Sequence, residues 1–459
     1  MSKRRTERTE KDSLGEVQVP AEAHWGAQTQ RAVENFPVLR PMPAAFIHAV
    51  ARIKWCAARV NADLDLLDTA RRDAICAAAE TIMAGEHDDQ FPVDIFQTGS
   101  GTSTNMNVNE VIASLCRQQG VKVHPNDHVN LGQSSNDVIP TAIHLATALA
   151  ISEQQLPALR QLHRTIAARR DELRGITKPG RTHLMDAMPV TLDQELGGWL
   201  AQLEQVEGQL QRARDGLLAI PQGGTAVGTG VNAHQEFAER FARTLSESTR
   251  HNFEPLDTPF AGQSAIDRPL AASAALRAHA TVLMKISNDL RWMNSGPIHG
   301  LGEIQLPAVQ PGSSIMPGKV NPVICESACM AAVQVTGLDQ AVNMAAQSGN
   351  FQLNVMLPLV GNNLLEMTQL LAGTSTILAE RAIAGFEVNT ENLRATISRN
   401  PVLVTALNPV IGYEKAAEIA KQAFASGRPV IDVAQEMTDL SREDLEYYLD
   451  PVKLTRGGL

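Results

Sequence analysis

The chain has 459 residues, and 40 Lys and Arg against 50 Asp and Glu give it a formal net charge of −10 at pH 7. This acidic balance disfavours a general binder of nucleic acid or of anionic membranes, because both rely on summed positive charge. Apolar residues make up 44% of the chain and aromatic residues only 4%, so aliphatic side chains must pack the core, which favours helices over strands. We expect a mainly α protein of about three domains.

The N-terminal segment, the cysteines and the apolar runs indicate the cellular compartment. Residues 1–16 carry charges of both signs without an apolar run, so we interpret them as a disordered tail rather than a secretory signal. The five cysteines are scattered and odd in number, which disfavours a disulfide framework and favours buried thiols in a reducing compartment. No stretch approaches the roughly 18 uncharged apolar residues of a membrane span. We therefore expect a cytoplasmic protein.

Periodic patterns divide the rest of the chain into three regions. Residues 17–139 are interrupted by Pro and Gly and predict an N-terminal helical domain, with short helical patterns over 44–67 and 70–84. Residues 140–390 contain long segments in which apolar side chains recur every three or four positions. They predict a central bundle of some five long helices, with patterns over 192–217, after Asp267, over 322–346 and over 356–384. Residues 391–459 predict a small C-terminal helical domain, with helices over 413–425 and 432–449.

Four polar segments interrupt these patterns, and the first is QTGSGTSTNMN at residues 97–107. Gly99 and Gly101 free the backbone, and hydroxyl side chains follow them. Candidate caps for a helix beginning near residue 105 are Ser100, Thr102 and Thr104. Backbone amides at a helix N-terminus bind anions, although the segment by itself fits an ordinary capped turn better.

The second polar segment contains HPND at residues 124–127 and QSSND at residues 133–137. Its hydroxyls and amides gather before a helix that we expect to open near Pro140. His124 and His128 are four residues apart, which would suit a zinc ion on a helix. Pro125 and the Asn-Asp pair argue against a helix through them, so we do not predict a metal site.

The third and fourth segments carry candidate groups for proton transfer. His183 lies in a loop before the long helix expected at residue 191, and a loop imidazole is available near neutral pH, although a lone histidine is more often structural. Residues 311–322, PGSSIMPGKVNP, are rich in Pro and Gly and predict a flexible loop. Its two hydroxyls, one ammonium and one amide are suited to holding a carboxylate and handling one proton, and Glu326 follows them.

Together the four segments resemble the fumarase/aspartase superfamily. Its signature loop, Gly-Ser-Ser-x-Met-Pro-x-Lys-x-Asn, is present at residues 312–321. The resemblance extends from WGAQTQ at 25–30 to LVTALN at 403–408, with all motifs in the family order. It is closest to the class II fumarases, because this chain has Thr-His at 182–183, where aspartases usually have Thr-Gln. HPND, SSND and Pro-Gly-Lys here replace the Asn-Pro-Asn-Asp, Ser-Thr-Asn-Asp and Pro-Ala-Lys typical of aspartases.

The resemblance implies a fold, a reaction and an assembly. The fold is the mainly α, three-domain fumarase/aspartase-like fold, whose central five-helix bundle forms a twenty-helix core in a homotetramer. The reaction is the reversible hydration of fumarate to L-malate, with active sites shared between three subunits. The implied partners are fumarate and L-malate, with no nucleic acid and no membrane. No metal or organic cofactor is implied.

The resemblance also assigns roles to residues. Ser313 is the implied base, His183 the implied acid that serves the departing hydroxyl, and Glu326 the implied partner of His183. The catalytic group is completed by Lys319, which with Asn321 would stabilise charge on the substrate carboxylate. The implied substrate-binding residues are Ser100, Gly101, Thr102, Ser134, Ser135, Asn136, Thr182, Ser314, Lys319, Val320 and Asn321. A second dicarboxylate site is implied at His124, Pro125, Asn126 and Asp127, where a capped turn is an equally good interpretation.

Two other functions remain open at this point, and a third is disfavoured. An aspartate ammonia-lyase is the nearest alternative, and a hydratase of a related dicarboxylate such as mesaconate is another. The chain has Gly132 where Ser is usual in the family and Gln352 where Glu is usual, which leaves the fine substrate preference open. A helical scaffold without activity predicts a damaged loop or a missing His183, and the sequence shows neither.

Overall fold

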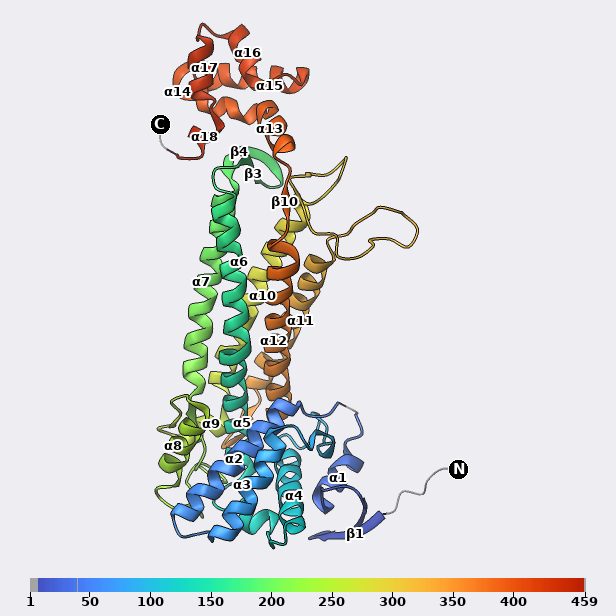
Figure 1. Ribbon diagram of the computed structural model, residues 1–459. Coiled ribbons are helices and arrows are strands. Elements are labelled where there is room, and N and C mark those ends of the chain that lie inside the picture. Colours follow the sequence, from blue (N-terminus) through green and yellow to red (C-terminus); the bar gives the residue numbers. More distant parts are fainter. Residues whose placement is uncertain (1–6, 39, 458–459) are drawn as a thin grey trace. The chain divides into compact units, whose positions relative to one another are not determined.

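The computed structural model describes residues 7–38 and 40–457, and helices dominate it (Figure 1). The chain forms two compact units. Unit 1 consists of Met1–Pro157, Glu207–Ala280 and Val333–Ala372, and unit 2 consists of Ala158–Val206, Thr281–Ala332 and Gly373–Leu459. These limits differ from the predicted boundaries at residues 139/140 and 390/391, so the division into three domains stays a prediction. Among the described residues, no helix has both the length and the hydropathy that a membrane crossing requires.

Unit 1 begins with a hairpin and short helices and continues with two-residue strands between longer helices. Its elements are β1 (Glu7–Asp12), β2 (Gly15–Pro20), α1 (Ala27–Asn35), α2 (Ala44–Asp63), α3 (Thr69–Met83), η1 (Asp88–Gln90), α4 (Thr102–Gln118), η2 (Pro125–Val129), α5 (Ser135–Ala150), η3 (Ile151–Gln155), β5 (Ala219–Ile220), α8 (Phe237–Thr249), β6 (Glu254–Pro255), α9 (Pro259–Ser264), β8 (Gly349–Asn350) and β9 (Leu353–Asn354).

Unit 2 contains a longer hairpin and the short C-terminal helices. Its elements are β3 (Thr177–Thr182), β4 (Met185–Thr191), β7 (Ile304–Gln305), η4 (Ala379–Ile383), β10 (Glu387–Val388), α13 (Thr390–Arg399), η5 (Pro401–Leu407), α14 (Asn408–Ile411), α15 (Tyr413–Ser426), α16 (Val430–Met437), α17 (Arg442–Tyr448) and α18 (Pro451–Leu454). The long helices with residues in both units are α6 (Leu156–Glu172), α7 (Leu192–Leu217), α10 (Asp267–Met293), α11 (Val323–Ala346) and α12 (Leu357–Leu378).

The predicted long helices are confirmed. In α7, Leu196, Leu203, Leu210 and Leu217 recur every seven residues and are buried, as one face of a bundle helix requires. The helix α5 continues through one π-helical turn, η3, into α6, because the residues at both junctions keep right-handed helical angles. This continuous segment and the helices α7, α10, α11 and α12 make up the expected five in the described part of the chain.

The N-terminal tail is a correction. Residues 1–6 of the predicted disordered segment lie outside the described residues, but β1 and β2 pair as an antiparallel hairpin over residues 7–20. Val19 is fully buried on its inner face. The Arg8 guanidinium donates to the carbonyl oxygens of Pro20, Ala23 and Trp25 at 2.8, 2.6 and 2.6 Å. Charged side chains therefore alternate with inward-facing side chains along this hairpin. The Arg8 guanidinium holds the hairpin in place through its hydrogen bonds to these carbonyl groups.

The C-terminal helices of unit 2 surround an apolar cluster that includes Leu407, Ile419 and Val433. The single helix predicted over 432–449 is wrong, because the chain breaks into α16 and α17. Ser441 starts α17 with a capping box, in which its Oγ accepts from the amide of Asp444 at 3.1 Å. The break turns the apolar side chains of both short helices toward the same cluster.

Candidate active site

The first polar segment forms the start of α4 in unit 1. The helix begins at Thr102, three residues before the predicted start, with Gly101 as its N-cap in the left-handed region at φ +72°. None of the predicted hydroxyl caps acts as one. Instead, the side chain of Gln97 accepts from the amide of Thr104 at 2.9 Å. The backbone N–H groups of Thr102 and Ser103 have no acceptor in the described chain, so they are open to an anion.

The second segment forms the start of α5, also in unit 1. This helix begins at Ser135 rather than near Pro140, because Ser134 and Asp137 form a capping box. The Ser134 amide donates to Asp137 Oδ1 at 2.8 Å, and Ser134 Oγ accepts from the Asn136 amide at 3.2 Å. Pro140 is therefore inside the helix, where it leaves the Asn136 carbonyl without its usual i+4 donor. The N–H group of Ser135 has no acceptor in the described chain.

Two contacts bring these helix starts together. Asn105 Nδ2 donates to Ser135 Oγ at 3.0 Å. A Cβ atom placed on Gly101 would lie 2.8 Å from Cγ1 of Ile139, so only glycine lets the two segments approach this closely. The structure therefore places Ser100, Gly101 and Thr102 beside Ser134, Ser135 and Asn136, and their joint role in binding stays a prediction.

Asp137 anchors the start of α5 to a neighbouring loop. Its Oδ2 accepts from the amides of Gly223 and Thr225 at 3.0 and 2.9 Å. Burial raises the pKa of this carboxyl to about 6, and the hydrogen-bonded amides and the Lys54 ammonium oppose the rise. Asn136 Nδ2 donates to the carbonyl of Ala226 at 2.8 Å. The loop at residues 223–226 therefore holds both Asn136 and Asp137 in place at the start of α5.

Pro125–Val129 form one π-helical turn, η2, with His124 as its N-cap, so the expectation that no helix passes through this segment is wrong for this single turn. His128 Nδ1 accepts from the His124 amide at 2.8 Å, and His124 Nδ1 accepts from the Asp127 amide at 3.1 Å. One ring nitrogen of each imidazole is therefore occupied by a backbone amide. Pro125 fits at the first position of the turn, where its missing N–H costs nothing.

A cavity of about 490 Å³ in unit 1 is lined by His124, Pro125 and Asn126 together with side chains of the N-terminal hairpin and α4. Arg8 and Lys11 come from the hairpin, and sequence reasoning missed them because it treated this segment as a tail.

The free charge at this cavity is positive. Among its acidic residues, Glu10 pairs with Arg8 at 2.8 Å and Asp12 pairs with Arg31 at 2.8 Å. Glu110 accepts from three amides at the start of α1, which opposes the burial that raises its pKa. Lys11 and Arg117 line the same cavity and have no partner in the part of the chain that the structure describes. Unpaired cations beside acids that are already satisfied favour an anionic occupant.

In unit 2, Thr182 and His183 lie at the tip of the β3–β4 hairpin. Thr182 pairs with Met185, so His183 and Leu184 form a two-residue turn, and their φ angles are +56° and +60°. Such a turn usually needs Asn or Gly, so a histidine here is strained. The His183 side chain is exposed.

Buried ion pairs support the strands of this hairpin. Glu303 is 1% exposed and lies 2.7 Å from Lys178 Nζ and 2.5 Å from Arg181 Nη1. Lys178 also pairs with Glu195 at 2.7 Å. Breaking a buried ion pair would leave an uncompensated charge. The ion pairs of Lys178 and Arg181 therefore hold β3, the strand that leads to His183.

The signature loop of unit 2 is closed by its own backbone. The Gly312 amide donates to the Lys319 carbonyl at 2.8 Å, and Asn321 Nδ2 donates to the Gly312 carbonyl at 2.6 Å. Ser313 Oγ accepts from the amides of Ile315 and Met316 at 3.2 and 3.0 Å. Two N–H donors on one hydroxyl oxygen stabilise its alkoxide. Asn321 is occupied by the loop in this geometry, while Ser314, Lys319 and Val320 are exposed.

The remaining predicted contact, between His183 and Glu326, is not made within the chain. Both residues belong to unit 2, and no hydrogen bond or ion pair joins them among residues 7–38 and 40–457. The pairing stays a prediction, and it requires another copy of the chain or a rearrangement.

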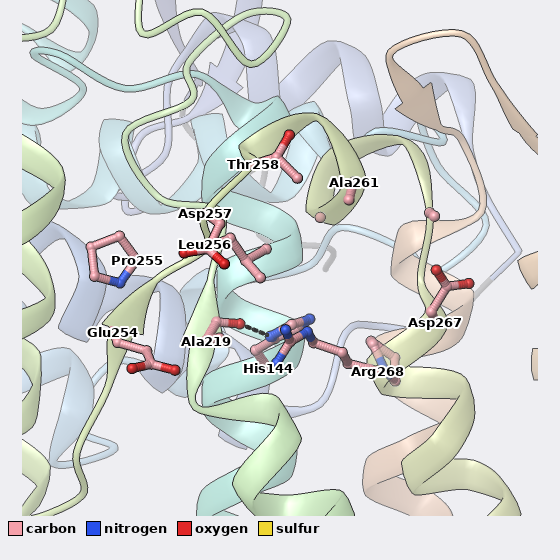
Figure 2. Close-up of a pocket in the computed structure, with 13 residues that line it drawn as sticks. His144, Ala219, Glu254, Pro255, Leu256, Asp257, Thr258, Ala261, Asp267 and Arg268 are labelled. Atoms are coloured by element: carbon pink, nitrogen blue, oxygen red, sulfur yellow. Dashed lines mark hydrogen bonds between the residues drawn. The ribbon is translucent and has the colours of Figure 1, made fainter.

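A separate cavity of about 360 Å³ in unit 1 contains none of the predicted site residues (Figure 2). His144 is buried in its wall, and its Nδ1 lies 2.8 Å from the carbonyl of Ala219 and 3.1 Å from that of Leu217. Burial lowers the pKa of His144 to about 4. Arg268 donates to the carbonyl of Gly216 at 2.6 Å. These side chains satisfy carbonyl groups at the end of α7, which is a structural role.

Comparison with known proteins identifies the family. A family model described as Lyase matches residues 15–337, and one described as Fumarase C C-terminus matches residues 403–456. The protein named Fumarate hydratase class II 2 from Pseudomonas aeruginosa is 57% identical over 98% of this chain and 99% of its own length. The chain belongs to the class II fumarate hydratase family.

Further members of the class II fumarate hydratase family agree with this assignment. Fumarate hydratase class II from Xylella fastidiosa is 53% identical over 98% of this chain and 96% of its own length. The crystal structure of recombinant class II fumarase from Schistosoma mansoni has a TM-score of 0.95 and 37% identity, covering 98% of this chain and 99% of that chain. The resemblance read from the four segments is thereby confirmed, and so is the mainly α fold class.

The close approach of α4 and α5 in this fumarate hydratase family member gives a test. Gly101→Ala should lower the free energy of unfolding by about 2 kcal/mol more than Gly120→Ala, because only the first methyl group meets a packed side chain. Gly120 is the matched control, since its φ is +80° and no atom lies within 4 Å of its Cβ position. Urea midpoints of both variants measure the difference. Equal midpoints would contradict the packing argument.

Proposed function

We propose that this chain catalyses the reversible hydration of fumarate to L-malate. The observation that carries the proposal is the closed loop around Ser313, whose Oγ receives two backbone N–H groups. Membership in the class II fumarate hydratase family supports the same reaction. The residue roles below are part of the proposal.

The dehydration of malate is difficult because the proton beside a carboxylate is weakly acidic, and its removal adds charge to an anionic group. We assign proton removal to the Ser313 alkoxide, which becomes a hydroxyl as the carbanion forms. The two amides that donate to Oγ lower the free energy that is needed to form the alkoxide. Lys319, exposed on the same loop, supplies positive charge to the oxyanion and to the substrate carboxylate.

We assign the second proton to His183. As the bond between carbon and the hydroxyl oxygen breaks, the imidazolium donates its proton and the hydroxyl leaves as water. The turn of the β3–β4 hairpin exposes this side chain, which makes it accessible to a substrate. Pairing with Glu326 would favour the charged imidazole and fix its orientation.

Substrate carboxylates are assigned to the starts of α4 and α5. The open N–H groups of Thr102, Ser103 and Ser135 are donors for an anion at a helix N-terminus. Further polar groups of both units complete the proposed set, which consists of Ser100, Gly101, Thr102, Ser134, Ser135, Asn136, Thr182, Ser314, Lys319, Val320 and Asn321.

We further propose a homotetramer whose active sites draw on three subunits. Within the chain, His183 and Glu326 do not meet, which favours a contact between copies. Several large apolar side chains are exposed on α10 and α11, namely Trp292 at 51%, Met330 at 68%, Val333 at 63% and Met344 at 63%. Apolar side chains at such density on long helices favour burial against other subunits.

The cavity beside His124 is assigned to a second dicarboxylate. Its occupant would bind through His124, Pro125, Asn126 and Asp127, with Lys11 and Arg117 supplying the unpaired charge. The cavity lies outside the set of groups that carry the reaction, so we assign it to binding and not to chemistry.

The reaction is tested with a substrate panel. Purified protein should remove the ultraviolet absorbance of fumarate without ammonium and should act more weakly on mesaconate. Ser313→Ala should lower kcat by about 100-fold or more, while Ser398→Ala, an exposed serine on α13, should match the parent. Loss of absorbance only with ammonium would indicate the aspartate ammonia-lyase, and full activity of Ser313→Ala would remove Ser313 from the mechanism.

The second site is tested by binding in the Ser313→Ala background, where turnover does not interfere. Adding Lys11→Gln and Arg117→Gln should weaken one class of malate sites by about tenfold or more, measured by calorimetric titration. In the otherwise native chain the same pair should leave kcat/KM unchanged. Lys122→Gln is the control, because this nearby cation does not line the cavity. An isotherm unaffected by the double change would remove these cations from the site.

A further inference from the structure

Lys54 is a buried lysine on α2. Its side chain is 0% exposed, and a buried ammonium is costly unless it is paired. Nζ donates to Asn130 Oδ1 at 2.9 Å and to Gln133 Oε1 at 3.0 Å. The ammonium is therefore held by two amide oxygens from a single neighbouring segment.

These two amides belong to the connection between η2 and α5. Asn130 ends the η2 turn, and its Nδ2 donates to the Gln133 carbonyl at 3.1 Å. Gln133 Nε2 donates back to the carbonyls of Val129 and Leu131 at 3.1 and 3.2 Å. Because Lys54 can only donate, it fixes the oxygen of each amide toward itself and the nitrogen toward this backbone.

The same oxygen of Asn130 connects Lys54 to the substrate-binding group. Asn130 Oδ1 also accepts from Asn105 Nδ2 at 3.1 Å, and that Nδ2 donates to Ser135 Oγ at 3.0 Å. Since Ser135 Oγ already accepts from Asn105, its own hydroxyl hydrogen is free to point at a bound carboxylate. Asn130 Oδ1 is thus an acceptor shared by Lys54, Asn105 and, at 3.3 Å, Asn109 Nδ2. The relay from Lys54 through Asn130 and Asn105 to Ser135 lies entirely within unit 1.

The charge on Lys54 faces the same helix start. Burial lowers the pKa of Lys54 to about 7, and the Asp137 carboxylate in the first turn of α5 opposes that shift. The interaction between Lys54 and Asp137 places a buried cation near the start of α5, where we propose that a substrate dianion binds. Hydrogen bonds in a buried network of this kind orient its members, although Asn105 Oδ1 is buried without a partner in the described chain.

We propose that Lys54 is a positioning residue that orients the Ser135 hydroxyl toward the substrate through Asn130 and Asn105. The inference rests on the proposed function, because only there does Ser135 bind a carboxylate. Lys54 itself does not touch the substrate. Its ammonium also ties the η2 turn of the second cavity to the start of α5, so both ligand-binding segments depend on one buried side chain.

The test separates KM from kcat. Lys54→Met, which replaces the aliphatic part of the side chain and removes the ammonium, should raise KM for malate by about tenfold and change kcat by less than about threefold, because the lost orientation weakens one hydrogen bond to a charged group. A merely structural role would lower the fraction of active enzyme and leave the KM of that fraction unchanged. An unchanged KM in folded Lys54→Met overturns the inference.

A double-mutant cycle checks the relay. In a Ser135→Ala background, Lys54→Met should raise KM no further, because the hydroxyl that it orients is gone. Additive effects on KM would contradict the relay. If Lys54→Met does not fold, Asn105→Ala replaces it in the cycle with the same expectation. Asn107→Ala is its control, since Asn107 is buried on the same helix and donates to Gln90 outside the relay.

The outcomes also distinguish the two proposals. A wild-type protein that does not hydrate fumarate defeats the proposed function, whatever the variants do. A wild-type protein that hydrates fumarate, together with a Lys54→Met variant of unchanged KM, leaves the proposed function in place and defeats the role of Lys54.

Discussion

Open backbone amides at the adjacent starts of α4 and α5 are the constraint on which the arrangement of unit 1 depends. A protein of net charge −10 that binds a dianion must concentrate positive potential locally. The N–H groups at a helix start provide it without a mobile side chain. Gly101 allows the two helix starts to approach, and the bond from Asn105 to Ser135 holds them there. Mutations that separate these helices should therefore affect binding before they affect the chemistry.

The buried polar network behind these helix starts explains how they are kept in place. Asp137 receives amides from the loop at residues 223–225, and Lys54 holds the connection that leads into α5. The groups of unit 2 to which we assign proton transfer are held differently. His183 projects from a strained hairpin turn, and Ser313 sits in a loop closed by its own backbone. Under the proposed function, unit 1 supplies fixed donors for binding, and unit 2 supplies the exposed His183 and the half-buried Ser313 for proton transfer.

Much of the fold follows from the sequence, because a repeated apolar stripe such as Leu196, Leu203 and Leu210 allows few alternatives to a long helix. Local capping was harder to predict. Gln97 replaces the expected hydroxyl cap of α4, and the Ser134 and Asp137 box starts α5 ahead of Pro140. The hairpin over residues 7–20 was missed because its charged side chains are typical of a solvated tail. In the structure, Arg8 holds the hairpin through hydrogen bonds to backbone carbonyl groups.

The site residues could be named from the four polar motifs, but their contacts could not. Lys54 gave a weak signal, as a single cation on the apolar face of a helix, and its partners lie about 80 residues away along the chain. The pairing of His183 with Glu326 depends on more than one chain under the proposed assembly, so no single-chain pattern can test it.

Complementation between inactive variants tests the central claim, that each active site combines residues of different subunits. His183→Asn and Ser313→Ala proteins would be unfolded, mixed in equal amounts and refolded together. If each site takes His183 from one subunit and Ser313 from another, random assembly gives about a quarter of the sites both native residues and restores about that share of activity. Activity no higher than the sum of the separately refolded variants would contradict the shared site.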